Sequence, residues 1–357
     1  MVNFTHKDDP CSHCGTCFSY CLWDRFEREH PGVAGNPSLC LDCMACYNIC
    51  ARVHPSESFP PDELFAGAAR HPLLAPYREA WSGSATKKAA NAQDGGVTTV
   101  LLQAMFDRGM IDGAALVGRD GRWNPVATVA RNANELAAGA GSKYTAAPGM
   151  TDLSDALSSC ERLAVVTVPC QTTAVRNQMR RGPKYLPERL VAVLGLFCYE
   201  TFRYEAVQAL VEEDFAVPME QVSRFDIKKN RLIFFRDGDA EPLGNAPLTD
   251  LKDHTWPVCH TCTDFTAELA DVSLGAVGSK PGENTILIRT PLGRDVVEGA
   301  VAAGLLTLDP VRNLGLVERI SENKRKRRAE LTPEEVRFLT KQTLRGNYKK
   351  LMLKGQW

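Results

Sequence analysis

Apolar residues along the chain fall into blocks that predict alternating helices and strands. Two continuous apolar runs, Leu163–Val168 and Leu190–Phe197, are typical of strands that are covered on both faces. Apolar residues at helical spacing follow a turn at Gln93–Gly96 and predict a helix that continues through Phe106. The pattern therefore predicts a domain of mixed α/β type.

Shorter apolar runs predict the remaining strands of this domain. They are Ala114–Val117, Val126–Val129 after a turn at Arg119–Gly121, Arg231–Phe235 behind a hairpin turn at Lys229–Asn230, and the pair Val272–Val277 and Thr285–Ile288. Near the C-terminus, Thr332 precedes a proline and two glutamates, a capping-box pattern that predicts a helix towards Thr343.

Composition divides the chain into four parts. We expect a cysteine-rich unit at 1–54, a proline-rich linker at 55–84, a large domain at 85–320 and a basic helical tail at 321–357. The expected fold class is α+β/α/β, with a small cysteine-rich domain followed by a larger mixed α/β domain.

Cysteines supply the first chemical signal. Two copies of C-x-x-C-x-x-C-x-x-x-C stand within the first fifty residues, at Cys11, Cys14, Cys17 and Cys21 and again at Cys40, Cys43, Cys46 and Cys50. This doubled spacing is typical of a small bacterial-ferredoxin-like two-cluster domain, which holds two [4Fe-4S] clusters and in which the fourth cysteine of each run binds the other cluster. We therefore expect Cys11, Cys14, Cys17 and Cys50 on one cluster, and Cys40, Cys43, Cys46 and Cys21 on the second.

Zinc and disulfides are the alternatives for these eight thiols. Structural zinc sites use paired ligands, which this spacing does not offer. Disulfides need an oxidising compartment, but the first residues, MVNFTHKDDP, show neither an apolar signal core nor a cleavage site. The proline that usually follows each fourth cysteine is replaced by Leu22 and Ala51, which alters the loops but not the ligands. We expect a reduced, cytoplasmic electron carrier.

Charge and hydropathy exclude some partners. The 357-residue chain carries 42 basic and 43 acidic residues, so no overall charge favours nucleic acid. It has no apolar run of eighteen residues that would predict a membrane span. The basic run Lys324–Arg328 is expected to be a solvated helix face, with a docking patch for an acidic partner protein or for membrane headgroups as the alternative.

Five cysteines remain beyond the doubled motif. Both long apolar strands end at one of them, Cys170 and Cys198, and the carboxyl edge of such a sheet is where ligands usually bind. Cys259 and Cys262 add two more thiols, so these four are candidates for a third four-thiolate site. Cys160 has no such partner and is interpreted as a small hydrophobic residue.

Five segments in this order carry a resemblance to a known family. They are QDGG at Gln93–Gly96, GSKYT at Gly141–Thr145, PCQ at Pro169–Gln171, GLFC at Gly195–Cys198 and CHTCTDFTAELADVSLGAVGS at Cys259–Ser279. Together they resemble the beta subunit of the coenzyme F420-reducing hydrogenase and dehydrogenase family. The electron-input subunit of F420H2 dehydrogenase is similar to this chain in carrying an N-terminal double-cluster unit.

The resemblance implies a flavin enzyme of archaeal methanogenesis. It implies FAD, coenzyme F420 as the substrate, and a [4Fe-4S] cluster on Cys170, Cys198, Cys259 and Cys262, which brings the total to three clusters. Residues that fall in the flavin motif are Asp94, Gly95, Gly96, Thr98, Thr99, Lys143 and Tyr144. Independently of the family, Gly95 and Gly96 precede a helix N-terminus that favours anions, and Lys143 is a candidate partner for a pyrophosphate or for the reduced flavin. An ordinary turn and a surface lysine are the alternatives for these residues taken alone.

The expected function is hydride transfer between coenzyme F420 and FAD, followed by one-electron transfer through three clusters to partner subunits or ferredoxin. No catalytic acid–base residues are expected. The chain is expected to belong to a hetero-oligomer, with peripheral docking to a membrane complex as an option. The alternatives are an iron–sulfur relay subunit of a hydrogenase, formate dehydrogenase or heterodisulfide reductase complex, and a related flavin and iron–sulfur reductase of another substrate, such as a tetrapyrrole.

Overall fold

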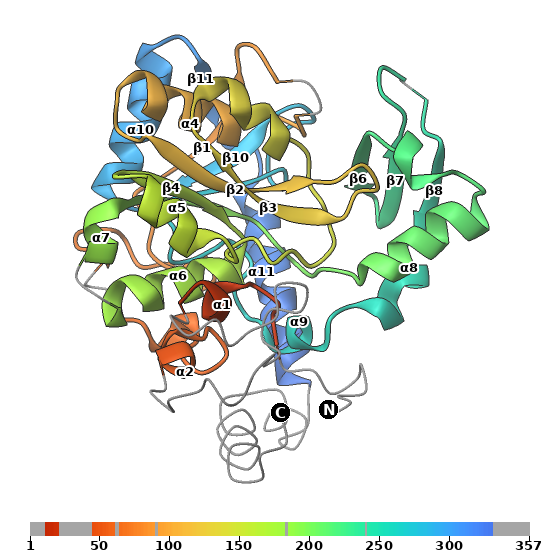
Figure 1. The fold of residues 1–357 in the computed structure, drawn as a ribbon, viewed down its shortest axis with the longest axis horizontal. Coiled ribbons are helices and arrows are strands. Elements are labelled where there is room, and N and C mark those ends of the chain that lie inside the picture. Colours follow the sequence, from red (N-terminus) through yellow and green to blue (C-terminus); the bar gives the residue numbers. More distant parts are fainter. Residues whose placement is uncertain are drawn as a thin grey trace.

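An eight-stranded mixed sheet organises the large domain in the computed structural model of the protein, which describes residues 11–20, 45–60, 64–89, 92–182, 185–239 and 241–330 (Figure 1). The strand order is β11-β1-β10-β9-β5-β4-β2-β3. The bounds of these strands are β1 Glu79–Ala85, β2 Gly113–Arg119, β3 Pro125–Ala130, β4 Leu163–Thr167, β5 Leu190–Leu196, β9 Val272–Gly275, β10 Asn284–Ile288 and β11 Leu306–Pro310.

Helices connect and cover these strands. The α-helices are α1 Thr16–Tyr20, α2 Ala45–Ile49, α4 Val97–Asp107, α5 Leu153–Ser159, α6 Pro169–Arg181, α7 Tyr185–Arg189, α8 Tyr204–Ala209, α9 Pro257–Thr261, α10 Pro291–Ala302 and α11 Leu314–Ala329. Short 3₁₀ turns lie at η2 Ser56–Ser58, η3 Ala133–Gly139, η5 Met219–Gln221 and η6 Leu248–His254, and a π-helical turn, η4 Leu210–Asp214, follows α8.

The centre of the sheet is parallel and its margins are antiparallel. Strand β4 runs parallel to both β2 and β5, and β5 runs parallel to β9. The other neighbouring pairs, including β2 with β3 and β9 with β10, are antiparallel. The expectation of a mixed α/β domain is confirmed, and the predicted helix after Gly96 and the apolar strands all form.

Alternate residues of the central strands pack into two separate cores, as the period of a strand requires. In β4, Ala164 and Val166 join the core under α4 and α10. Leu163 and Val165 point the other way and join the core under α5, α6 and α7. Burial on both faces explains why β4 and β5 appear in the sequence as continuous apolar runs.

A second, three-stranded sheet lies beside the large one and consists of β6 (Arg224–Lys228), β7 (Arg231–Phe235) and β8 (Gly244–Pro247). The predicted hairpin is confirmed, since Lys228 pairs with Arg231 across a two-residue turn. Lys229 and Asn230 both have positive φ, 51° and 58°, which is the backbone of a type I′ turn.

The expected linker at 55–84 extends too far. Residues 79–84 belong to β1, which pairs with β10 and β11 inside the large sheet. The small residues Ser82, Gly83 and Ser84 give little strand signal, and only their pairing partners place them. The preceding proline-rich segment is not an extended linker throughout, since it contains the 3₁₀ turn η2 and further turns. It is held by the buried Arg289, which donates to the carbonyls of Leu74 and Pro76 at 2.8 and 2.9 Å.

The described part of the cysteine-rich unit packs directly on the large domain. The backbone N–H of Met150 donates to the carbonyl of Cys14 at 3.0 Å, and Asn177 donates to the carbonyl of His54 at 2.7 Å. Gly15 has a φ of 83°, and a Cβ there would stand 2.7 Å from the backbone nitrogen of Thr151. The glycine thus permits a close approach between the two parts of the chain.

The basic run Lys324–Arg328 is expected from the sequence to form a solvated helix face. This expectation is wrong for Lys324, which is buried. Helix α11 runs through the expected boundary at residue 321, and Lys324 is only 2% exposed. The helical period places Val317, Ser321 and Lys324 on one side, and all three are buried against the domain. The predicted helix after Thr332 lies outside the described residues, as do Cys21, Cys40 and Cys43.

No helix within the described residues is both long and apolar enough to cross a membrane.

Candidate functional site

A cavity of about 980 Å³ opens at the carboxyl ends of the central strands. Its volume stands at the upper end of the range of about 300–1,000 Å³ that is typical of small-molecule sites. Its lining includes the residues of the predicted flavin motif other than Gly95, together with the four predicted ligands of the third cluster, namely Asp94, Gly96, Thr98, Thr99, Lys143, Tyr144, Cys170, Cys198, Cys259 and Cys262. Segments that lie far apart in the sequence therefore share one cavity.

The turn before α4 forms one wall of this cavity. Gly96 caps the helix in a left-handed conformation with a φ of 67°, and Asp94 also has a positive φ of 49°. Gly95 packs so closely that a Cβ would stand 2.6 Å from the carbonyl oxygen of Gly83 and 2.7 Å from the nitrogen of Asn284. This close packing aims the N-terminus of an eleven-residue helix at the cavity, where its dipole favours a negatively charged group.

Gln93 connects this turn by hydrogen bonds to the segment around Tyr144 and to strand β6. Its side-chain amide donates to the hydroxyl of Tyr144 at 2.5 Å and to Asp226 of β6 at 2.9 Å, and its oxygen accepts from the N–H of Ser142 at 3.0 Å. Burial raises the pKa of Tyr144 to about 12, so its hydroxyl stays protonated. Gln93 was part of a motif in the sequence, but its bridging role depends on contacts that only folding brings about.

Lys143 lies beneath the same wall. Its ammonium donates to the carbonyls of Gly139, Ala140 and Gly141 at 2.9, 3.2 and 2.9 Å. Lys143 therefore caps the C-terminal end of η3. Burial, together with the nearby charge of Arg119, lowers its pKa to about 7. The role predicted for Lys143, a partner for pyrophosphate or for the reduced flavin, stays a prediction.

Four cysteines gather at the other end of the cavity. Cys170 lies in the first turn of α6, directly after β4, and Cys198 follows β5. Cys259 lies in α9, and Cys262 is the residue at which that helix ends. Burial, together with the charges of neighbouring thiols, raises the pKa of Cys198 to about 12 and that of Cys170 well above its ordinary value. Four neighbouring thiols at one end of a cavity fit a cationic iron–sulfur core, which would compensate the negative charge of their thiolates.

A second set of thiols lies in the N-terminal segment. Burial raises the pKa of Cys17, and the thiols of Cys11, Cys14, Cys50 and Cys46 raise it further, so all four lie near it. Two local hydrogen bonds hold the loop around Cys11 and Cys14. The thiol of Cys14 pairs with the hydroxyl of Thr16 at 3.3 Å, and the sulfur of Cys11 accepts from the N–H of His13 at 3.3 Å. The assignment of these cysteines to two clusters stays a prediction.

The two thiol sets adjoin one another. Apart from burial, the largest influence on the pKa of Cys170 comes from Cys14 of the N-terminal set, which raises it. Arg52 lies between the sets and donates to the hydroxyl of Thr261 at 2.6 Å. Burial lowers the pKa of Arg52, and the thiols of Cys262, Cys50 and Cys170 act in the opposite direction. Sequence spacing gave no sign that these two regions meet or that an arginine stands between them.

Two side chains of α11 join the cysteine loops of the large domain. Lys324 donates to the carbonyls of Cys198 and Asp264 at 2.6 and 2.7 Å. Arg327 donates to the carbonyl of Cys259 at 2.7 Å and pairs with Glu200 at 2.5 Å. Burial lowers the pKa of Lys324, but the thiols of Cys262, Cys198 and Cys259 raise it, and the net shift is upward.

Two further residues lie near the cysteines or share their chemistry. His260, between Cys259 and Cys262 in the sequence, is half-buried in α9, and burial lowers its pKa. Cys160 is buried in the core under α5, α6 and α7, as a small hydrophobic residue would be. Its thiol nevertheless also accepts from the guanidinium of Arg131 at 3.1 Å.

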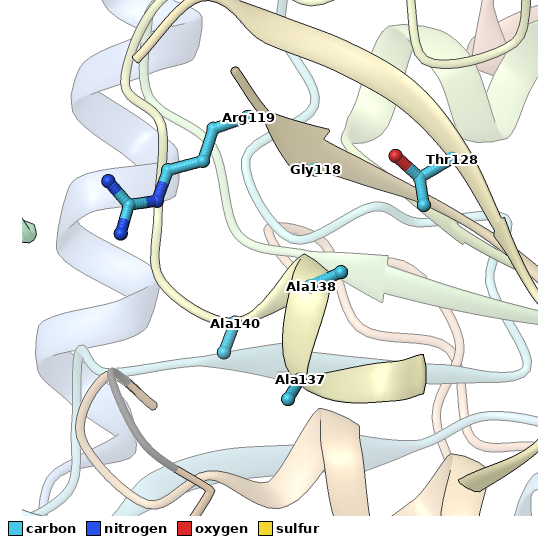
Figure 2. Close-up of a pocket in the computed structure, with 6 residues that line it drawn as sticks. All are labelled: Gly118, Arg119, Thr128, Ala137, Ala138 and Ala140. Atoms are coloured by element: carbon cyan, nitrogen blue, oxygen red, sulfur yellow. The ribbon is translucent and has the colours of Figure 1, made fainter. Parts of the chain in front are cut away.

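A smaller cavity of about 240 Å³ lies between the β2–β3 hairpin and η3 (Figure 2). Its lining is mostly alanine and glycine, with the Thr128 hydroxyl and the aliphatic part of Arg119 at its edges. The guanidinium of Arg119 is engaged elsewhere, over the ring of Trp123 at 4.2 Å and with the carbonyl of Val222 at 3.2 Å. This small cavity offers little chemistry of its own.

Among the side chains that the structure describes, no three of the His, Cys, Asp and Glu type converge closely enough to hold a single metal ion. The thiols of Cys170, Cys198, Cys259 and Cys262 instead line the wider space of the large cavity.

Comparison with known proteins identifies relatives over most of the chain. A family model for the "Coenzyme F420 hydrogenase/dehydrogenase, beta subunit N-term" matches residues 80–154, and one for its "C terminus" matches residues 160–313. The coenzyme F420 hydrogenase subunit beta of Methanothermobacter thermautotrophicus is 34% identical over 266 residues, which cover 71% of this chain and 94% of that protein.

Two further relatives extend the comparison. A subunit of the F(420)H(2) dehydrogenase of Methanosarcina mazei is 29% identical over 91% of this chain and 92% of that protein. The F420-reducing [NiFe] hydrogenase complex from Methanosarcina barkeri contains a chain that superposes with a TM-score of 0.69 at 28% identity, over 73% of this chain and 93% of that one.

The fold, the cavity and these relatives define an oxidoreductase subunit. The chain belongs to the family of coenzyme F420 hydrogenase/dehydrogenase beta subunits, as the resemblance of its motifs implied.

Proposed function

We propose that this chain is an electron-input subunit that oxidises or reduces coenzyme F420. In this proposal hydride passes between the coenzyme and FAD in the large cavity, and single electrons then pass through three [4Fe-4S] clusters to partner subunits or ferredoxin. A flavin supplies the change from two-electron to one-electron transfer that this scheme needs.

One observation supports the proposal above the others. The α4 turn and the Cys170, Cys198, Cys259 and Cys262 set line the same cavity. A cofactor bound with its anionic groups at the α4 N-terminus would therefore lie within the same space as the four thiols. Electron transfer from that cofactor to a cluster requires this kind of proximity.

The N-terminal cysteines provide a route out of the cavity. Cys14 has the largest influence of any charged group on the pKa of Cys170, so the cluster on Cys11, Cys14, Cys17 and Cys50 would receive electrons next. The match to the Methanosarcina mazei dehydrogenase covers 91% of this chain, well beyond residues 80–313 of the two family models. This coverage favours a protein of the dehydrogenase type, within a hetero-oligomer.

The test is purification and reconstitution of the full chain without oxygen. We expect bound FAD and about twelve irons per chain, from three four-iron clusters. We also expect the protein to oxidise the reduced coenzyme, which is measured through the visible absorbance of the coenzyme. Iron without flavin would instead indicate an electron relay with no flavin reaction of its own. Flavin and iron without any reaction of the coenzyme would indicate a reductase of another substrate, to be sought by substrate screening.

A further inference from the structure

Helix α11 brings a buried positive charge to the cysteine site from outside the region that the family models match. The C-terminal family match ends at residue 313, and α11 begins at Leu314. Val317 of this helix packs with Leu74 and Phe265 in a separate small core, which fixes the helix against the domain. The next buried positions along the same face are Ser321 and Lys324.

Among the residues that the structure describes, no carboxylate lies at hydrogen-bond distance from the ammonium of Lys324. Its ammonium is bound by two uncharged groups, the carbonyls of Cys198 and Asp264. The carboxylate of Asp264 is turned elsewhere, because it accepts from the backbone N–H of Glu268 at 3.0 and 3.2 Å. The neighbouring basic residues of α11 differ, since Arg325, Arg327 and Arg328 each pair with a glutamate.

A buried ammonium in such a place is costly unless negative charge lies near it. The groups that act on Lys324 as negative charges are the thiols of Cys262, Cys198 and Cys259, followed by Asp264. A four-thiolate iron–sulfur cluster is an anion, and it gains one further negative charge when it takes up an electron. A fixed cation close by stabilises the reduced form more than the oxidised form, because Coulomb attraction grows with the charge.

We propose that Lys324 is a positioning residue for the third cluster, whose charge raises the reduction potential of that cluster. This inference rests on the proposed function, because it requires a cluster on Cys170, Cys198, Cys259 and Cys262. The electron comes from the reduced flavin, is held at the third cluster, and leaves to the N-terminal cluster beside Cys14. Lys324 exchanges no proton and no bond in this step. Its two hydrogen bonds also hold the Cys198 loop to the segment that follows Cys262.

The experiment is a redox titration of the reconstituted full chain, with dithionite as reductant and electron paramagnetic resonance of the third cluster as readout. Lys324→Met removes the charge and keeps the apolar stem. We expect its equilibrium constant for reduction to fall about tenfold, which for a one-electron couple is a shift of about 59 mV to lower potential. Lys324→Arg is expected to keep the potential of the unchanged protein.

A matched control lies two residues away on the same helix. The side chain of Lys326 is 62% exposed and pairs with Glu322, so Lys326→Met removes an equal charge from solvent rather than from the site. We expect this variant to leave the potential unchanged. A shift of the same size in both methionine variants would overturn the proposal, because it would reflect the overall charge of the helix.

Lys324→Gln separates charge from hydrogen bonding, since an amide can still donate to both carbonyls. A full iron content with an unchanged potential in either neutral variant would overturn the proposal. Loss of the third cluster from both neutral variants but not from Lys324→Arg would support it. Loss from all three would overturn it, because the shape of lysine and not its charge would then be required. If the unchanged protein itself held no third cluster, the proposed function would fail first.

Discussion

Individual residues shape the wall of the cavity, either because they are small or because hydrogen bonds hold their side chains in place. Gly95 has no room for a side chain, since backbone atoms of Gly83 and Asn284 occupy the position of a Cβ. Lys143 has each of its three ammonium hydrogens directed at a carbonyl. Residues of both kinds set the shape of the wall, which matters for a cofactor whose position decides the rate of transfer.

Gly95→Ala should therefore both destabilise the chain and disturb the α4 turn. Forcing a methyl group against backbone atoms costs about 1–3 kcal/mol of unfolding free energy, and we expect weaker retention of flavin. Gly121→Ala is the control, because no atom lies within 4 Å of its Cβ position. The measurements are denaturant unfolding and the flavin content of the purified protein. Equal stability and flavin content in both variants would show that the turn can move aside at no cost.

Elements of the domain are joined by a few buried polar contacts around Asp271, at the start of β9. One of its carboxylate oxygens pairs with Arg176 of α6 at 2.8 Å and accepts from the N–H of Val193 in β5 at 2.8 Å. The other accepts from the hydroxyl of Thr290, which caps α10. A single carboxylate thus connects two strands with helices on opposite faces of the sheet.

Asp271→Ala should be among the more destabilising substitutions in the chain. It leaves the guanidinium of Arg176 buried and unpaired, which typically costs about 3–5 kcal/mol. The comparison is Asp295→Ala, which breaks the exposed pair with Arg108 and should cost about 0–1 kcal/mol. Denaturant unfolding of both variants, with cofactor content held equal, measures the difference. A similar small loss in both would mean that the site around Asp271 relaxes or admits water.

At the scale of the whole molecule, the large cavity ends at one set of thiols, and a second set lies directly behind the first. The Cys170 set lies inside the cavity, and the N-terminal set adjoins it through Cys14 and Arg52. Under the proposed function, electrons from a cofactor in the cavity would reach the Cys170 set before the N-terminal set.

Cys262→Ala should remove one cluster and separate the flavin from the N-terminal clusters. We expect iron to fall by about a third, since one of three four-iron clusters is lost, while the reduced coenzyme still reduces the flavin. Cys160→Ala is the control, because that thiol is buried beneath α5 outside both sets. Rapid mixing with the reduced coenzyme measures both steps. Normal reduction of all clusters in Cys262→Ala would show that the third site is misassigned.

The sequence by itself determined the local features of this protein. Cysteine spacing, the turn before α4 and the two apolar strands depend on residues close together in the chain, where period and ligand geometry act directly. The same applies to the placement of Cys170 and Cys198 at one edge of a sheet, since parallel strands end together. These features were sufficient to predict the family, the mixed sheet and some of the residues that line the cavity.

Only the tertiary structure decided which distant segments meet. The place of β1 in the sheet, the bridge made by Gln93, the closeness of Cys14 to Cys170 and the burial of Lys324 all join residues 50 or more positions apart. Such contacts depend on the packing of whole elements, and a lysine in a basic run has the same local pattern whether it faces solvent or a cysteine loop. The energy that selects between those two positions comes from the opposing surface, which the local sequence does not contain.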